Sequence, residues 1–159
     1  MNNRRSFIVG IKSTSLSFKE KVFLKEFKPW GVILFSRNIQ NIDQAKKLTQ
    51  SIRKIFHDAK YPILIDQEGG RVNRLEKLIS FENLTSEFFG KKYVSNFKEF
   101  KIYFKLFIDK TSYLLKLIGA NINTSPVLDL RIKGSSNIIG NRSFSKNPKV
   151  VSKIGDYCI

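Results

Sequence analysis

The stretch PILIDQEGGRVNRL, residues 62–75, passes from a short apolar run directly into a group of charged residues. The apolar run, 62–65, is too short for a helix and is typical of a buried strand. The charged residues that follow it are two acids and two arginines: Asp66, Glu68, Arg71 and Arg74. Between them, Gly69 and Gly70 let the backbone turn sharply and approach a ligand closely. Either this loop binds a ligand or its acids only neutralise its arginines, and the residues alone favour neither interpretation.

The sequence around this stretch predicts an alternation of strands and helices. The expected strands are short apolar runs at 7–11, 31–35 and 62–65, with a fourth strand or strand pair in 120–130. The expected helices lie at about 17–27, 41–57, 97–118 and 148–159, with one short helix within 75–93. Two of these helices begin with residues at capping spacing: Ser17 with Glu20, and Asn41 with Gln44. Strands that alternate with helices predict a parallel sheet buried on both faces.

Polar residues gather directly after the expected strands. They occupy 36–38 after the second strand, 66–74 after the third and 129–142 after the fourth. Loops that leave the carboxyl ends of parallel strands converge on one side of an α/β fold, and ligand sites are built there. The charged loop at 66–74 therefore lies where a site is expected.

The composition is that of one folded domain with a large basic excess. The chain has 159 residues, of which 42% are hydrophobic, and a formal net charge of +16. A nucleic-acid-binding module is one interpretation of that charge, because basic side chains displace phosphate counterions. However, 21 of the 29 basic residues are lysines, and they are scattered between apolar positions as on the solvated faces of amphipathic helices. Biased surface composition is therefore the favoured interpretation.

Several classes of protein fit the sequence poorly. No apolar run reaches the ~18 residues of a membrane-spanning helix, and the N-terminal apolar run lacks a signal-peptide cleavage site. Cys158 is the only cysteine, so no internal disulfide can form, and we expect a cytoplasmic protein. His57 is the only histidine, and its place at an expected helix end favours a capping role over catalysis. With one cysteine and one histidine, neither a metal site nor a nucleophilic triad is expected.

Four ordered segments resemble the signatures of glycoside hydrolase family 3, in particular its bacterial β-N-acetylhexosaminidase branch. They are GVILFSRNI (31–39), PILIDQEGGRVNRL (62–75), NINTSPVLDL (121–130) and IIGNRSF (138–144). The resemblance implies a (β/α)8 TIM-barrel of α/β class, of which residues 1–159 are the N-terminal part, roughly the first half. It also implies an enzyme that removes terminal N-acetylglucosamine from cell-wall fragments (muropeptides) during peptidoglycan recycling, with no cofactor and with no nucleic acid or membrane as partner.

The resemblance assigns substrate binding to three residues. Asp66 matches an aspartate that accepts hydrogen bonds from the hydroxyls of the sugar, and Arg74 and Arg142 match two substrate-binding arginines. Asn141 stands where many relatives carry an acidic residue, which leaves the ion-pair partner of Arg142 open.

The catalytic residues of the family are expected beyond Ile159. A retaining glycosidase needs an acid/base and a nucleophile on either side of the scissile bond, and the resemblance places both later in the family's sequence. Neither Glu68 nor Asp129 is promoted to those roles. About four of eight strands are present, so the sheet cannot close without a missing C-terminal half. A β-glucosidase of the same family remains an alternative function.

Overall fold

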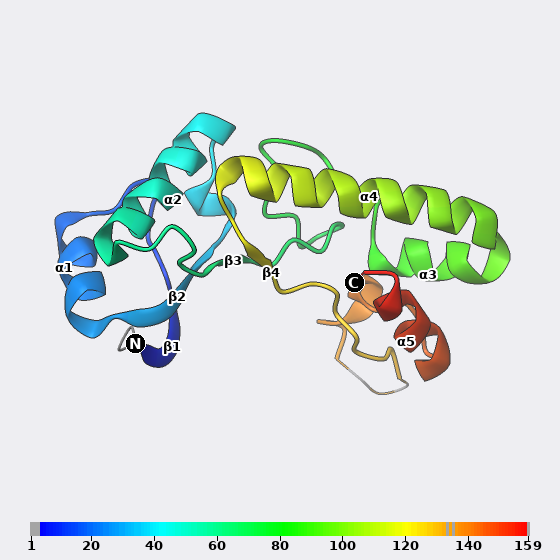
Figure 1. Cartoon of the computed structure of the whole chain (residues 1–159). Helices are drawn as coiled ribbons and strands as arrows, with labels where there is room; N and C mark the ends of the chain where they lie inside the picture. The colour runs from blue at the N-terminus through cyan, green and yellow to red at the C-terminus, as the bar shows by residue number, and fades with distance from the viewer. Residues whose placement is uncertain (1–3, 133, 135, 159) are drawn as a thin grey trace. The chain divides into compact units, whose positions relative to one another are not determined.

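The computed structural model describes residues 4–132, 134 and 136–158, which form two compact units (Figure 1). Unit 1 comprises residues 4–66, 74–80 and 113–124. Unit 2 comprises residues 67–73, 81–112 and 125–158.

Unit 1 is an α/β unit with four parallel strands. The strands are β1 (Arg5–Gly10), β2 (Pro29–Leu34), β3 (Ile63–Ile65) and β4 (Ile122–Asn123). Its helices are α1 (Phe18–Phe27), α2 (Ile42–Phe56), the short η1 (Ser36–Asn38) and the last turns of α4 (Phe97–Ile118). The strands pair in the order β1-β2-β3-β4, so each strand lies beside its neighbour in sequence. This order is that of a barrel, whereas a doubly wound sheet reverses its strand order in the middle.

One face of this sheet is closed by helices. The β2–β3 register places Val32 opposite Ile63 and Leu34 opposite Ile65, and all four side chains are fully buried. Buried residues of the helices complete this core: Leu24, Ala45, Leu48, Ile52, Leu115 and Ile118. Figure 1 shows α1 and α2 beside each other on one side of the strands.

The other face of the sheet is also apolar but only partly covered. Ile33 and Ile122 on this face are half-buried, and Ile8 is exposed. Leu64 is buried here because Gly31 makes room for it: a Cβ on Gly31 would lie 2.8 Å from Leu64 Cδ1. An apolar face of this kind fits the prediction of a sheet that needs further strands to close.

The predicted helix ends are largely confirmed. Glu20 N–H donates to Ser17 Oγ over 3.2 Å and Ser17 N–H donates to Glu20 Oε2 over 2.8 Å, which is a capping box. Gln44 N–H donates to Asn41 Oδ1 over 2.9 Å at the start of α2. At the end of α4, Gly119 adopts φ 81°, a left-handed conformation in which glycine carries no steric penalty.

The fourth strand is much shorter than predicted. A strand pair over 120–130 is wrong, because β4 ends at Asn123 and residues 124–130 belong to no strand. The partner strand β3 ends at Ile65, and the last ladder-like bond runs from Thr124 N–H to Ile65 O over 2.9 Å. Pro126 then has no N–H to donate.

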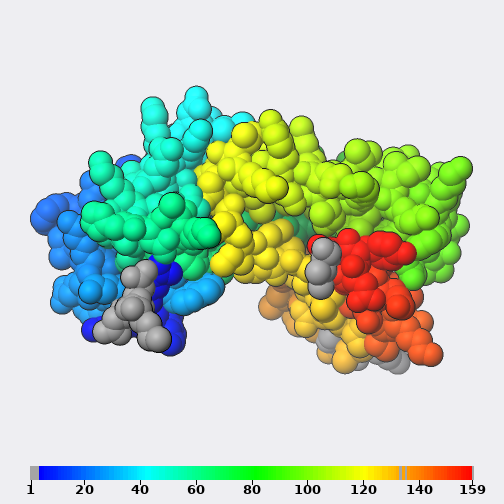
Figure 2. All heavy atoms as spheres, in the orientation of Figure 1, coloured from blue at the N-terminus to red at the C-terminus, as the bar shows by residue number. Residues whose placement is uncertain are grey.

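Unit 2 is built from helices and loops. It contains α3 (Ser86–Ser95), the larger part of α4, the short η2 (Gly140–Arg142) and α5 (Pro148–Asp156). Figure 2 shows the red atoms of the C-terminal segment packed against green atoms of the preceding helices, and α3 contacts both α5 and η2. The short helix predicted within 75–93 is α3, which begins at Ser86 in the second half of that range. A series of turns occupies the first half. No described helix of either unit is long and apolar enough to span a bilayer.

Two isoleucines of α4 give a matched test of the core of unit 1. Ile118 is fully buried, whereas Ile102 is 52% exposed in the same helix. We expect Ile118→Ala to lower the free energy of unfolding by about 2–5 kcal/mol, because it leaves a cavity. Ile102→Ala should change it by less than about 1 kcal/mol. Urea unfolding of the two variants measures the difference, and equal effects would contradict this description of the core.

Candidate functional site

The carboxylate of Asp66 lies at the carboxyl end of β3, as the sequence predicts. It accepts a hydrogen bond from the hydroxyl of Thr124, the residue that follows β4. Because β3 and β4 are parallel neighbours, the residues after both strands meet at the same edge of the sheet. Asp66 is therefore held by the adjacent strand end and not by its own loop alone.

Arg74 lies beside Asp66 in unit 1. Its Nη2 is 3.6 Å from Asp66 Oδ2, and both side chains remain about one quarter exposed. The guanidinium carbon of Arg74 also lies 5.3 Å from the ring centroid of Phe35, which follows β2. A cation over an aromatic face is attracted by the ring quadrupole. The contacts with Phe35 and Asp66 place the arginine beside the ends of two neighbouring strands.

The end of β2 is fixed by a buried amide. Asn38 is fully buried, and its Nδ2 donates to the carbonyls of Ile11 over 3.2 Å and Ser13 over 2.8 Å, both in the loop after β1. Its Oδ1 accepts from Phe35 N–H over 2.9 Å. These bonds connect the first two strand-end loops and support Phe35.

The double glycine of the charged loop lies in unit 2 and forms a tight turn. Gly69 and Gly70 adopt φ of 85° and 57°, a region that other residues rarely enter. A Cβ on Gly69 would lie 2.3 Å from Leu84 O, so the backbone itself is packed closely. The turn closes through a bond from Glu68 N–H to Val72 O over 3.1 Å.

Glu68 pairs with Arg142, in unit 2. Arg142 Nε donates to Glu68 Oε2 and Nη2 donates to Oε1, each over 2.8 Å. The side chain of Glu68 is 7% exposed and that of Arg142 is 23% exposed. Two parallel bonds between a guanidinium and a carboxylate fix the plane of both groups.

Arg71 bonds to the loop that leads to Arg142. Its Nη2 contacts the carbonyl oxygens of three successive residues, Asn137 at 3.1 Å, Ile138, and Ile139 at 3.3 Å. The idea that the acids of the 66–74 loop only neutralise its own arginines is therefore wrong for Glu68 and Arg71, whose partners lie about 70 residues later. It holds only for Asp66 and Arg74, which do form a pair.

The three predicted substrate-binding residues fall into both units. Asp66 and Arg74 lie together in unit 1, and Arg142 lies with Glu68 in unit 2. Sequence reasoning missed Thr124 and Phe35 as supports of the site. Both directly follow the observed strands, but the predicted strands included them, so the strand-end rule that selected Asp66 did not select them.

His57 and Asp129, the other residues considered for a chemical role, make contacts that support the fold. His57 caps α2 with φ 49°, and its N–H bonds to Arg53 O and Lys54 O, in agreement with the predicted capping role. Asp129 is exposed, and its backbone carbonyl accepts from Ser143 Oγ over 2.7 Å. Among the residues that the structure describes, no three His, Cys, Asp or Glu side chains converge as a metal site would need.

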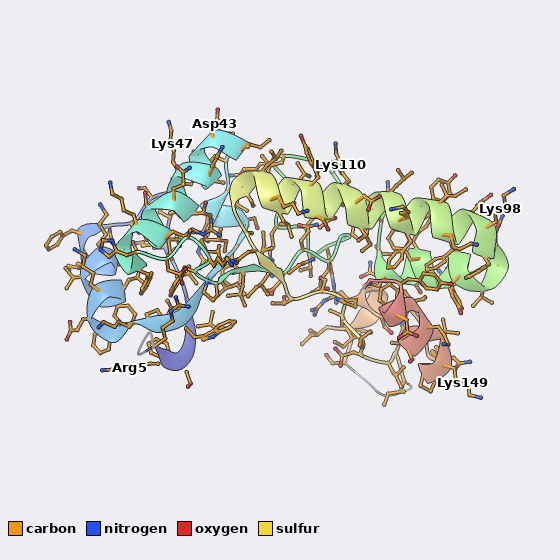
Figure 3. All side chains as sticks on the ribbon, viewed as in Figure 1. Arg5, Asp43, Lys47, Lys98, Lys110 and Lys149 are labelled. Carbon is orange, nitrogen blue, oxygen red and sulfur yellow. The ribbon has the colours of Figure 1, made fainter. Side chains whose placement is uncertain are left out.

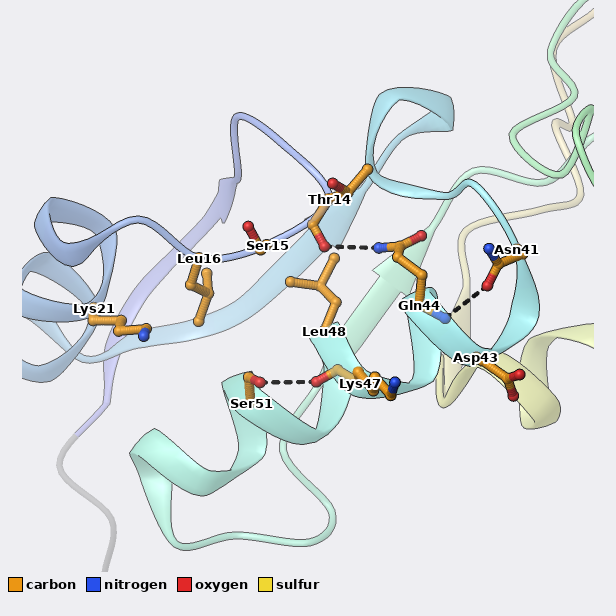
Figure 4. Close-up of a pocket in the computed structure, with 10 residues that line it drawn as sticks. All are labelled: Thr14, Ser15, Leu16, Lys21, Asn41, Asp43, Gln44, Lys47, Leu48 and Ser51. Carbon is orange, nitrogen blue, oxygen red and sulfur yellow. Dashed lines mark hydrogen bonds between the residues drawn. The ribbon is translucent and has the colours of Figure 1, made fainter.

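A pocket of about 610 Å³ in unit 1 lies apart from these residues (Figure 4). It opens between the loop after β1 and the first half of α2, over Leu16 and Leu48. Its polar groups serve the fold: Gln44 Nε2 donates to Thr14 O over 2.7 Å, and Ser51 Oγ donates to Lys47 O over 2.8 Å. Neither Asp66 nor Arg74 lines it.

The labelled lysines point outward from several helices (Figure 3). Lys47 projects from α2, Lys98 and Lys110 from α4 and Lys149 from α5. These four side chains agree with the prediction that lysines occupy the solvated faces of helices.

Comparison with known proteins identifies the family. Residues 11–159 match the model described as "Glycosyl hydrolase family 3 N terminal domain". The chain belongs to glycoside hydrolase family 3. A relative from Hydrogenovibrio crunogenus named beta-hexosaminidase is 35% identical over 93% of this chain. A relative with the same name from Thioalkalivibrio sulfidiphilus is 31% identical over 94%.

Solved structures of family 3 agree with the fold. Native NagZ from Neisseria gonorrhoeae matches 95% of this chain with 30% identity and a TM-score of 0.82. The same protein in complex with N-trifluoroacetyl-D-glucosamine gives a TM-score of 0.83. The predicted fold class, an incomplete TIM-barrel of α/β type, is thereby confirmed. This chain spans 41–42% of the length of the two beta-hexosaminidases and 43% of native gonococcal NagZ.

Cys158 gives a prediction about reactivity. Burial raises the pKa of its thiol to about 11. Since the thiolate is the nucleophile, and a raised pKa lowers its fraction, the folded chain at pH 8 should react with a disulfide reagent roughly a hundredfold more slowly than the unfolded chain. Release of the coloured thiol from the reagent measures both rates. The folded chain is assayed in buffer and the unfolded chain in about 6 M guanidinium. Equal rates would show that the thiol is not buried.

Proposed function

We propose that this chain supplies the sugar-binding part of a family 3 β-N-acetylhexosaminidase, which removes terminal β-linked N-acetylglucosamine. One observation carries the proposal: the Asp66 carboxylate lies at the carboxyl end of β3, bonded to Thr124 and beside Arg74. Relatives named beta-hexosaminidase support the activity, and the gonococcal complex with N-trifluoroacetyl-D-glucosamine supports an N-acylated amino sugar as ligand.

The chemistry of each residue suits its proposed role. Asp66 accepts hydrogen bonds from sugar hydroxyls, because a carboxylate offers several lone pairs and the Thr124 bond occupies only one of them. Arg74 and Arg142 donate to polar substituents of the saccharide, for which the planar, fixed donors of a guanidinium are well suited.

Residues 1–159 form the N-terminal part of one catalytic barrel domain in this proposal. The remaining barrel supplies the nucleophile and the acid/base that a retaining glycosidase needs. The partly covered sheet face with Ile8, Ile33 and Ile122 supports this division, since further strands would bury it. The substrate of the whole protein is then a muropeptide that contains N-acetylglucosamine, cleaved in the cytoplasm during peptidoglycan recycling without a cofactor.

The alternatives are less well supported. A β-glucosidase of the same family would share these strand-end residues, but the names of the relatives favour N-acetylhexosaminidase activity. Turnover of glucoside and N-acetylglucosaminide substrates by a whole enzyme separates the two. A nucleic-acid-binding module is not favoured, since membership of family 3 accounts for the signatures.

The 159-residue chain should bind saccharide without cleaving it. Incubated with an aryl N-acetyl-β-glucosaminide, the purified chain is expected to release no aryl alcohol above the buffer rate, since the proposed site contains no nucleophile or acid/base. A chromogenic assay tests this, with a whole family 3 enzyme as positive control. Clear turnover by the chain would refute the assignment of catalysis to the remaining barrel.

Asp66 can be tested in a hybrid enzyme. Residues 11–159 replace the matching segment of the gonococcal enzyme, which supplies the rest of the barrel. Asp66→Ala should lower kcat/KM of the hybrid by roughly a hundredfold, as expected for two lost charge-assisted hydrogen bonds to substrate. Asp43→Ala, an exposed carboxylate of α2, is the matched control and should leave kcat/KM within about twofold. Unchanged kinetics of the Asp66 variant in a folded, active hybrid would remove Asp66 from the site.

A further inference from the structure

Glu68 is a nearly buried carboxylate whose oxygens both bond to one guanidinium. Its side chain is 7% exposed, and its two oxygens accept from Nε and Nη2 of Arg142, each over 2.8 Å. The two residues are 74 positions apart in sequence. Glu68 is thus a long-range contact between the loop that contains the double glycine and the loop that contains Arg142.

The backbone around Glu68 is fixed independently of this pair. Gly69 and Gly70 follow it in left-handed conformations, and Gly70 N–H donates to Phe81 O over 2.8 Å. A Cβ on Gly70 would lie 2.7 Å from Thr85 Cγ2, so the turn packs closely against Thr85. Glu68 therefore extends from a rigid support.

The backbone that carries Arg142 is short and depends on contacts from elsewhere. Arg142 ends the single turn η2, where its N–H donates to Ile139 O over 2.8 Å. Arg71 contacts the carbonyls of the residues just before this turn. The neighbouring Asn141 is neutral, so it cannot balance the charge of Arg142.

We infer that Glu68 is the positioning residue for Arg142: it fixes the plane and rotamer of the guanidinium that contacts the saccharide, and it takes no part in proton transfer. This inference rests on the proposed function. Two parallel N–H···O bonds hold a guanidinium in one plane. Loss of these two bonds would restrict the plane of the guanidinium less, and ordering it on binding would weaken the affinity for ligand.

Binding of N-acetylglucosamine to the full 159-residue chain tests this inference. With 15N-labelled arginine, the Nε–H signal of Arg142 is assigned by its loss in Arg142→Lys. We expect N-acetylglucosamine to shift this signal in the original chain, and isothermal titration calorimetry gives Kd for every variant, including those that lack Arg142. Glu68→Gln should raise Kd about tenfold, since it replaces an accepting carboxylate oxygen by an NH2 group that faces the donors of Arg142. Glu68→Asp keeps the carboxylate on a shorter side chain and should restore most of the affinity, to within about threefold of the original.

A double-mutant cycle separates positioning from a direct role. If Glu68 acts through Arg142, adding Glu68→Gln to Arg142→Lys should change Kd by less than about twofold. Glu87→Gln is the matched control: Glu87 pairs with Arg131 over 2.8 Å in the same unit, outside the proposed site, and its loss should leave Kd unchanged.

The outcomes distinguish the two levels of the proposal. A chain that binds no N-acetylglucosamine, or whose affinity ignores Arg142→Lys, overturns the proposed saccharide site and the inference with it. Suppose that Arg142→Lys weakens binding. Only the positioning role of Glu68 is then overturned if Glu68→Gln leaves Kd unchanged, or if Glu68→Gln raises Kd equally in the original chain and in Arg142→Lys. If Glu68→Gln fails to fold, Glu68→Ala takes its place, and an unchanged Kd with an unchanged Nε–H signal in that variant overturns the role.

Discussion

The constraint on which this structure depends is the two-sided apolar character of its parallel sheet. Neighbouring parallel strands need helical crossovers, so the segments between them must run back across a face of the sheet. In unit 1 these segments bury Val32, Leu34, Ile63 and Ile65 completely. The opposite face is equally apolar, yet no described helix buries Ile8 there. In a barrel that face points to the interior and is filled by side chains of the remaining strands. The strand order in sequence and the partly covered face therefore have the same explanation.

The same constraint determines where polar chemistry can occur. β2 and β3 consist of apolar residues, so hydrogen-bonding side chains collect beyond their ends, where the backbone leaves the ladder. Asn38, Asp66 and Thr124 are such groups, each just beyond a strand or the turn that follows it. Their bonds join loops that are distant in sequence, and two adjacent strand ends hold one carboxylate in place. The site is thus a consequence of parallel pairing as much as of the loop sequence.

The sequence predicted the architecture better than the pairing of charges. Hydrophobic runs and capping residues located β2, β3, α1 and α2 closely, because periodicity and caps are local properties. The length of β4 was not predictable in this way, since it depends on where its partner β3 ends. The partners of Glu68 and Arg71 were not predictable either: local spacing pairs them with each other, whereas the double-glycine turn directs both toward residues 137–142.

The two acids of this loop show how position decides the role of a carboxylate. Glu68 is nearly buried, and the arginine that it holds engages both of its oxygens. Such a carboxylate is a poor base or nucleophile, because proton transfer or attack would first have to break a bidentate ion pair. Asp66 is two residues away and about one quarter exposed; it accepts from the Thr124 hydroxyl and lies 3.6 Å from Arg74 without a bidentate pair, so lone pairs remain for a ligand in the proposed site. Binding and bond cleavage therefore require different carboxylates, and the acids of this loop suit support and binding. Cleavage needs a further pair ~5 Å apart on either side of the sugar, which only additional strand ends of a closed barrel can bring to the same substrate.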